Sequence, residues 1–160
     1  MQTQLIFRRS LHALVVACCL VLASGCNKDI IREHGLDAEQ LVAGRLDGTW
    51  GDPTAVSTPN DIPSEIFGNM RLVFTTGADG YPVQFSAKDC PIIFGSETGT
   101  WSVAGTAEDG RVTLSGVEPV DEFTIQVSST SLTLSFYMGW ENTDTGEKGE
   151  GDFHVTLARK

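Results

Sequence analysis

Eight short segments in which apolar and polar residues alternate constrain the fold of this chain more than any other feature. They follow one another from Leu46 towards the C-terminus. Successive side chains of a β-strand point to opposite faces, so each segment is predicted to be a strand with one apolar face. After the first segment, LDGTWG, the apolar positions are Met70, Leu72 and Phe74; Tyr81, Val83 and Phe85; Trp101 and Val103; Val112 and Leu114; Phe123, Ile125 and Val127; Leu132, Leu134, Phe136 and Met138; and Phe153, Val155 and Leu157.

The same pattern predicts how these strands pair. One polar face per strand is typical of antiparallel sheets, whereas the strands of parallel sheets are continuously apolar. No helix of crossover size separates the segments, so an up-and-down order is the simplest topology. Closing eight strands into a barrel removes the exposed edges. We therefore predict an all-β protein with an eight-stranded antiparallel up-and-down barrel, and a β-sandwich is the alternative.

A short helix is predicted before the first strand, in the sequence LDAEQLVAGRL. Asp37 is its N-cap, Gln40 stands at the spacing of a capping box, and Gly44 can end it. Leu41 and Val42 are the residues that we expect this helix to bury.

Two long segments are predicted to be loops that join strands. Residues 52–65 are polar and contain three prolines, and residues 139–151 are rich in glycine and acids. Shorter turns are expected at residues 77–80 and at Asp109-Gly110, which is a turn dipeptide.

Several motifs resemble those of small lipocalin-like (calycin-type) lipoproteins of bacterial envelopes. These motifs are Gly48-Thr49-Trp50 after the short helix, RLVFTT, SETGTWSVAG and SSTSLTLSF, and together they span residues 46–157. The resemblance implies a lipocalin-like barrel in which a tryptophan closes one end and stacks on an arginine from the last strand. Gly48, Trp50 and Arg159 are the matching residues here.

The N-terminus has the three parts of an export signal. Arg8 and Arg9 are basic, Leu11–Ala23 is largely apolar, and small residues precede Cys26. This stretch of 13 residues is too short to span a bilayer unaided, although a short uncleaved anchor is an alternative. The twin arginine leaves export of the folded protein as a second possibility.

The residues around Cys26 resemble a bacterial lipobox, in which the cysteine becomes the first mature residue and carries the lipid. Several alkyl chains on Cys26 would give stable anchoring. We expect residues 1–25 to be the signal peptide, 26–45 to be a tether with the short helix, and 46–160 to be the barrel domain. Asn27 favours the outer membrane over the inner one, whereas the side that the domain faces stays open.

Cysteine pairing depends on the fate of Cys26. If it carries lipid, Cys90 is a solitary thiol. If it does not, the two could form a disulfide in an oxidising compartment. The neighbouring Asp89 disfavours a thiolate, so we expect Cys90 to be a buried, unreactive thiol.

The charge of the chain excludes some partners. The formal net charge is −10, and it becomes −12 when Arg8 and Arg9 leave with the signal. Nucleic acid and anionic lipid surfaces bind basic proteins, so neither is an expected partner.

No catalytic, metal-binding or cofactor-binding constellation is found in the sequence. His34 and His154 are the only histidines after the signal, which is too few for a usual zinc site. His154 alternates with apolar neighbours and should face solvent. The acidic segment 141–152 begins like an EF-hand loop but fails at its glycine and at its final glutamate. We expect no enzyme activity, no cofactor and no metal.

Two classes of function remain. The first is a binding module in which a small apolar ligand contacts residues inside the barrel. These residues are Phe74, Phe85, Trp101, Ile125 and Phe136. The second is a protein-interaction subunit, adhesin or inhibitor that acts through the loops 52–68 and 139–151, with Ile62, Ile66 and Phe67 as an exposed apolar patch.

Overall fold

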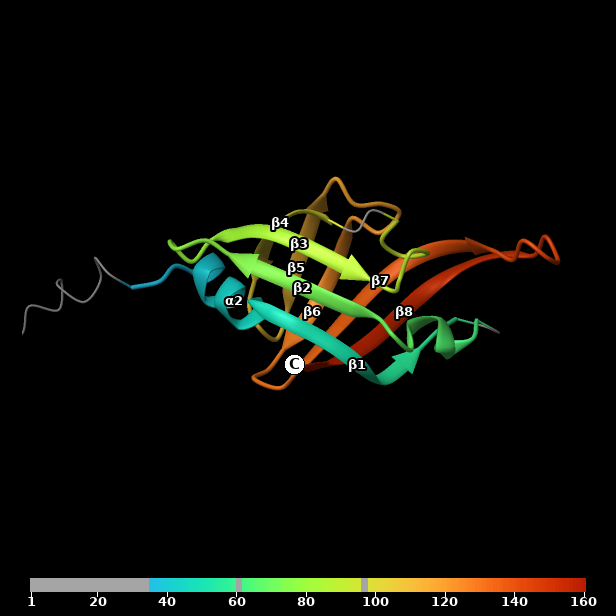
Figure 1. Ribbon diagram of the computed structural model, residues 1–160, viewed down its shortest axis with the longest axis horizontal. Coiled ribbons are helices and arrows are strands. Elements are labelled where there is room, and N and C mark those ends of the chain that lie inside the picture. The colour runs from blue at the N-terminus through green and yellow to red at the C-terminus, as the bar shows by residue number, and fades with distance from the viewer. Residues whose placement is uncertain (1–34, 60–61, 96–97) are drawn as a thin grey trace, which may run out of the picture. The chain divides into compact units, whose positions relative to one another are not determined.

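Eight antiparallel strands form a closed barrel in the computed structural model, which describes residues 35–59, 62–95 and 98–160. Each strand pairs with the next one along the chain, and β8 closes the barrel on β1 (Figure 1). The predicted barrel is confirmed, and the β-sandwich alternative is wrong. The elements are α2 (Ala38–Leu46), β1 (Gly48–Ser57), the 3₁₀ helix η1 (Ser64–Phe67), β2 (Arg71–Thr76), β3 (Pro82–Lys88), β4 (Thr98–Gly105), β5 (Gly110–Ser115), β6 (Glu122–Val127), β7 (Ser131–Glu141) and β8 (Lys148–Arg159).

The barrel interior is the hydrophobic core, and the alternation of the sequence creates it. In β5, β6 and most of β7, every second residue is buried while the residues between are more exposed. The register keeps apolar partners on the same face, as where Leu134 pairs with Val155 and Val112 pairs with Phe123. One continuous cluster of buried apolar side chains therefore runs through the barrel.

Helix α2 lies across one end of the barrel (Figure 1). The capping box is present: Asp37 accepts from the backbone N–H of Gln40 at 2.9 Å, and the Gln40 side chain accepts from the backbone N–H of Asp37 at 2.8 Å. Val42 is buried as predicted, together with Leu46. Among the described residues, no helix is long and apolar enough to cross a membrane.

Two expectations about α2 are wrong. Gly44 does not end the helix, because the next turn carries Leu46 into the core, where it is fully buried. Leu41 is 55% exposed instead of buried, since it lies on the face of α2 that points away from the barrel core.

The prediction that residues 52–65 form a loop is wrong for the first part of this range. Strand β1 continues through Pro53 to Ser57 and pairs with β8, with register shifts on either side of Pro53. A proline is tolerated at such an irregularity, because no regular ladder hydrogen bond is required of its nitrogen. Asp52 adopts a positive φ of 47° at this point.

The predicted loop 139–151 is shorter than expected. Strand β7 continues to Glu141 and β8 begins at Lys148, so only residues 142–147 form the turn. We call the paired residues 136–141 and 148–153 the ribbon, and it projects at the end of the barrel opposite α2 (Figure 1). The pairing of β7 with β8 overrides the low strand propensity of the glycines in the ribbon.

Strand β3 departs from the predicted face at its beginning. Phe85 and Ala87 are buried, but Val83 is 49% exposed and Tyr81 is 38% exposed. A register shift next to Thr76 interrupts the alternation here. Residues before this irregularity therefore leave the inward face.

Candidate functional site

The five residues predicted to contact a ligand inside the barrel pack against the rest of the core. All five are at most 5% exposed. The ring centroid of Phe74 lies 5.2 Å from that of Phe85 and 5.0 Å from that of Trp101. Trp101 donates its indole N–H to the backbone carbonyl of Thr75 at 3.1 Å. The pockets described below are lined by other residues.

The most apolar of these pockets lies at the end of the barrel that carries η1 and the ribbon, away from α2 (Figure 1). We call it the mouth pocket, and its volume is about 470 Å³. Ligand pockets of about 300–1,000 Å³ with mostly apolar walls are the usual size and character of small-molecule sites. Its lining residues are Ile62, Pro63, Ile66, Ile92, Met138, Trp140, Glu141, Asn142, Thr143, Asp144 and Phe153.

Aromatic packing makes the floor of the mouth pocket rigid. The Phe153 ring is stacked on Phe136, with centroids 5.3 Å apart and planes 3° from parallel. Phe67 of η1 contacts the other side of this cluster, with its centroid 6.1 Å from that of Phe153. Packed aromatic side chains leave little room for rearrangement. The floor is therefore preformed.

The predicted apolar loop patch is only partly correct. Ile62 and Ile66 are half-buried, and both line the mouth pocket. Phe67 is fully buried and plugs the barrel, so its prediction as an exposed residue is wrong. Residue 67 ends a single 3₁₀ turn, which points its ring inward.

Trp140 forms one wall of the mouth pocket and is not among the site residues predicted from the sequence. Its indole ring lies on Gly149, its cross-strand partner: a Cβ at position 149 would come within 2.6 Å of the indole Cε2. Its Nε1 is buried and has no hydrogen-bond partner within the described part of the chain. Every second residue from Leu132 to Met138 points into the barrel, and Trp140 is the next residue in this alternation. The alternation was therefore the sequence signal that could have identified Trp140.

The rim of the mouth pocket is polar and acidic. Glu141 forms an ion pair with Lys148, with 3.0 Å between Oε2 and Nζ. The side chain of Asn142 accepts from the backbone N–H groups of Asp144 and Thr145 at 2.9 and 3.2 Å, which fixes the turn. Within the described ranges, no group of three or more His, Cys, Asp or Glu residues could hold a metal ion.

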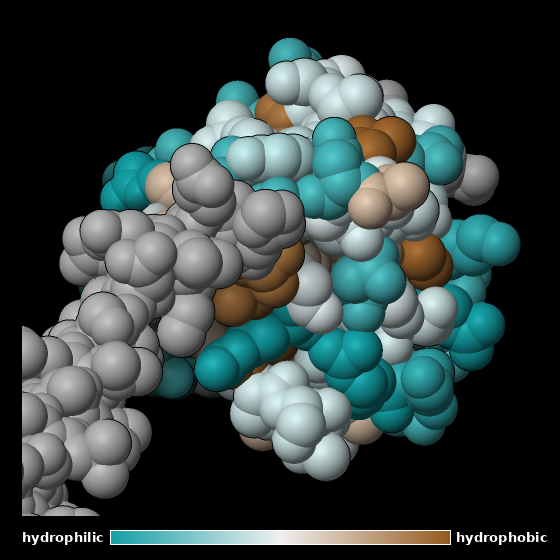
Figure 2. Space-filling view, turned by 90° about the vertical axis from the view of Figure 1, so that its left-hand side faces the viewer, coloured by the Kyte–Doolittle hydropathy of each residue, from teal (hydrophilic) through white to brown (hydrophobic). Residues whose placement is uncertain are grey.

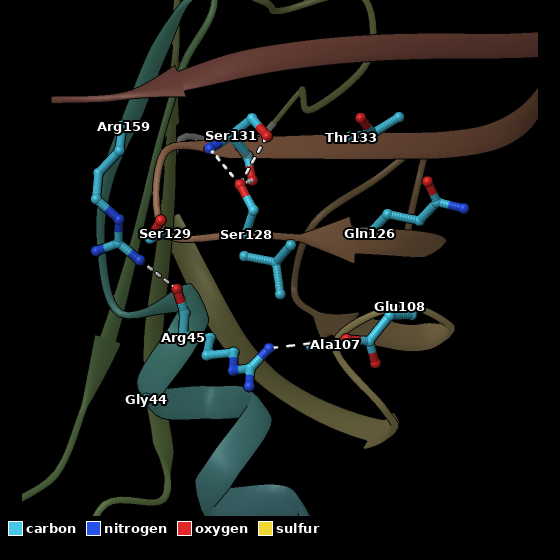
Figure 3. Close-up of a pocket in the computed structure, with 11 residues that line it drawn as sticks. Gly44, Arg45, Ala107, Glu108, Gln126, Ser128, Ser129, Ser131, Thr133 and Arg159 are labelled. Atoms are coloured by element: carbon cyan, nitrogen blue, oxygen red, sulfur yellow. Dashed lines mark hydrogen bonds and ion pairs between the residues drawn. The ribbon is translucent and has the colours of Figure 1, made fainter.

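A larger and more polar groove, of about 1090 Å³, lies beside α2 (Figure 3). Its polar side chains are largely engaged with one another. The Ser128 and Ser131 hydroxyls are 2.8 Å apart, Arg45 points towards Glu108 at 3.9 Å, and Arg159 donates to the carbonyl of Arg45 (Figure 3). On the coloured surface that Figure 2 shows at this end of the barrel, apolar residues form separate spots among hydrophilic and intermediate ones. One buried donor of a lining residue, Nε of Arg159, has no hydrogen-bond partner within the described part of the chain.

Gly48, Trp50 and Arg159 lie together at the same end. The Arg159 guanidinium lies over the Trp50 ring, with Cζ 4.3 Å from the ring centroid. Gly48 has a φ of +121°, and a Cβ there would approach Nη1 of Arg159 to 3.2 Å. A glycine is needed because its backbone conformation and the close guanidinium both exclude a side chain.

One hydroxyl–imidazole pair occurs on the outer face of the barrel. The Ser135 hydroxyl is 2.7 Å from Nδ1 of His154, and both residues are cross-strand partners in β7 and β8. His154 is exposed, as predicted from the alternation. Neither residue lines the mouth pocket or the groove beside α2.

Cys90 is buried, and it is the free cysteine of the described residues. Burial first, and then the Asp89 carboxylate, raise the pKa of its thiol to about 12. This agrees with the prediction of an unreactive thiol. Cys26, predicted to carry the lipid, lies outside the described residues, as does the predicted signal peptide. No known protein family, curated protein or solved structure matches this chain.

Proposed function

We propose that this protein is a non-catalytic binding module that holds a small apolar molecule in the mouth pocket. The observation that carries this proposal is the pocket itself, an apolar hollow of about 470 Å³ at one end of a closed barrel. Burial of apolar ligand surface contributes about 25 cal/mol per Å², so a hollow of this kind favours apolar ligands. The interior residues Phe74, Phe85, Trp101, Ile125 and Phe136 then act by supporting the floor and not by touching the ligand.

The proposal includes the lipocalin-like character implied by the sequence motifs. In support, a short helix precedes the first strand of an eight-stranded barrel, and Arg159 lies on Trp50. Such a barrel either fills its interior with side chains or leaves room for one small ligand. Because side chains fill the interior of this barrel, we place the ligand in the mouth pocket.

Native mass spectrometry of the protein purified from its own host tests this function. A co-purified small molecule is expected with the natural protein. Ile66→Ser removes apolar surface from the pocket wall and should lose that molecule. Val83→Ser makes the same kind of change at an exposed residue outside the mouth pocket and should keep it. Equal loss in both variants, or no bound molecule in any of the three proteins, would argue against the proposal.

Anchoring of the module through Cys26 is part of the same proposal. The lipobox-like residues before Cys26 and the preceding apolar stretch support attachment to the cell envelope, with the outer membrane favoured by Asn27. Cys26→Ser should release the protein from membranes into the soluble fraction. If the variant chain stays with membranes after fractionation, lipid attachment at this residue is excluded as the anchor.

A protein-interaction role is the second candidate, and the ribbon is the observation that favours it. Strand pairing within the described ranges gives residues 136–141 a partner only on the β8 side. An unpaired strand edge can accept a strand from another protein. Tyr137 faces outward on this edge and is 59% exposed.

A photo-crosslinking amino acid at position 137 tests that second role in the host, and the same amino acid at position 81 is the control. A single protein adduct that forms only at position 137, and that is lost with the additional substitution Gly139→Lys, would support it. Adducts of the same pattern at both positions would exclude it.

A further inference from the structure

We propose that the mouth pocket selects compact amphiphilic cations, in which a protonated amine lies at the acidic rim and a short apolar tail fills the floor. This inference deepens the proposed function and rests on it. It names the charge and the size of the ligand, which the apolar walls alone do not determine.

The first step in the argument is the chemistry of the lining. Seven of its eleven residues are apolar, and they form the floor and walls: Ile62, Pro63, Ile66, Ile92, Met138, Trp140 and Phe153. The other four lie together at the end of the ribbon, from Glu141 to Asp144. The pocket therefore has an apolar side and a polar side, which matches a ligand with a tail and a head.

The second step is the sign of the charge on the polar side. No Lys or Arg is among the lining residues of the pocket. Lys148 neutralises Glu141 through their ion pair, whereas no ion pair of the described residues engages Asp144. Residues 141–152 contain five acids and one lysine, a net charge of −4. Their field extends over a Debye length of about 8 Å at physiological ionic strength, so an anionic head at the rim is repelled.

On the outer side of the ribbon, the pKa of Tyr137 is raised, first by desolvation, then by its hydrogen bond to Glu150 and by the charges of Glu150 and Asp152. These acids disfavour an additional negative charge, and they equally favour a positive one. The geometry of the pocket and this crowding of carboxylates point to the same class of ligand.

Trp140 provides a further contact for a cation. A cation over the face of an indole ring gains about 0.5–2 kcal/mol, depending on its exposure to water. Trp140 and the next residue along β7, Glu141, both line the mouth pocket. A protonated amine at the rim is therefore within reach of both an aromatic ring and a carboxylate.

The volume limits the size of the ligand. Liquid water occupies about 30 Å³ per molecule, so a pocket of about 470 Å³ has room for on the order of 15 non-hydrogen atoms. A chain of about ten carbons with its head group fits within this limit. A membrane lipid with two long acyl chains does not.

Three probes with the same tail test the inference: decylamine, decanol and decanoate. The full chain carrying Cys26→Ser is used, so that acyl chains attached at that residue cannot compete for the pocket. Binding is measured by titration calorimetry below the micelle concentration of each probe, with tryptophan fluorescence in parallel. At low salt we expect decylamine to bind about tenfold more tightly than decanoate, with decanol between them, because only the head charge differs. The difference should shrink as salt is added.

Matched variants locate the head group. Asp144→Asn removes one charge at the rim and should weaken decylamine binding severalfold while leaving decanol unchanged. Asp109→Asn also removes one negative charge, but in the β4–β5 turn, away from the mouth pocket. It should leave the binding of both decylamine and decanol unchanged. Equal effects of the two substitutions on decylamine would overturn the placement of the amine at the rim.

The outcomes separate this inference from the function on which it rests. If all three probes bind equally, or if decanoate binds most tightly, the selection for cations is wrong and the apolar pocket stands. If none of the probes binds with a stoichiometry near one, both the inference and the proposed function fail. Loss of all three probes in Ile66→Ser would place them in the mouth pocket.

Discussion

The guanidinium of Arg159, the last residue of β8, lies 4.3 Å above the ring of Trp50, which stands near the start of β1. The same arginine donates through Nη1 to the carbonyl of Asp47 at 2.9 Å and through Nη2 to the carbonyl of Arg45. Trp50 in turn donates its indole N–H to the carbonyl of Leu46 at 2.7 Å. Both side chains thus bind free carbonyls at the C-terminus of α2 and hold the helix on the barrel.

Arg159→Ala should lower the free energy of unfolding by about 2 kcal/mol, because it removes a cation–π contact and two hydrogen bonds. Urea unfolding followed by circular dichroism measures this change. Arg159→Lys keeps the charge but loses the planar fork, so it should restore only part of the stability. Arg111→Ala is the control: its ion pair with Glu122 is exposed, and its loss should cost less than about 1 kcal/mol. An unchanged midpoint for Arg159→Ala would mean that Trp50 is held by burial alone.

Gly149→Ala should displace the indole of Trp140, because a Cβ at position 149 would overlap the ring at 2.6 Å from Cε2. We expect the tryptophan emission to shift to longer wavelength and binding at the mouth pocket to weaken. Gly139→Ala is the matched control on the facing strand, since a Cβ there meets only an ordinary contact at 3.8 Å. The fluorescence spectrum of each variant is compared with that of the same variant carrying Trp140→Phe as well. This comparison shows whether the shift in emission comes from Trp140. A spectrum of Gly149→Ala identical to that of the natural protein would contradict the contact.

The stability that Asp37 contributes should disappear in acid. The pKa of its carboxyl lies below the ordinary value of 3.8, first because the Tyr81 hydroxyl donates to it and then because the backbone N–H of Gln40 does. A carboxyl with a lowered pKa stabilises the folded state above its unfolded pKa, and this contribution is lost as the pH falls through the folded pKa. Asp37→Asn keeps a capping oxygen but not the charge.

The difference in unfolding free energy between the natural protein and Asp37→Asn should therefore be present at pH 7 and shrink below pH 3.8. Urea titrations at both pH values measure it. Tyr81→Phe removes the main cause of the pKa shift and should reduce the same difference. A gap that is independent of pH would show that the charge of Asp37 has no part in holding α2.

Cys90 should resist alkylation while the protein is folded. With a thiol pKa of about 12, the thiolate fraction at pH 8 is about a thousandfold lower than that of an exposed cysteine. Peptide mass spectrometry after timed exposure to iodoacetamide measures the rate, and the urea-unfolded protein supplies the reference. Asp89→Asn should accelerate the folded reaction only slightly, because burial is the larger cause of the shift. Equal rates in the folded and unfolded protein would place the thiol in solvent.

The pattern of residues was sufficient to predict the barrel, because the alternation in β5, β6 and β7 has a single physical consequence. A strand with one apolar face must bury that face, and consecutive strands without long connections pair in order. The N-cap of α2 could be predicted as well, because Asp37 and Gln40 are only three residues apart and exchange side-chain-to-backbone hydrogen bonds. These features depend on neighbours in the chain.

The mouth pocket could not be predicted in the same way. Trp140 and Gly149 belong to a segment whose composition is typical of a loop, and only their pairing across β7 and β8 makes it a ribbon. The sequence predicts that Leu41 is buried, and only the way in which α2 packs on the barrel shows that it is exposed.

The sequence by itself therefore determined the number and order of the strands, the apolar faces of β5, β6 and most of β7, and how the short helix begins. The tertiary structure alone decided that the interior is filled, that the side chain of Phe67 is fully buried, and that the mouth pocket is lined by Trp140. The reason is that periodicity and capping are set by residues a few positions apart. The shape of a pocket, in contrast, depends on side chains such as Ile66 and Phe153, which are distant in the chain and meet only after the barrel has closed.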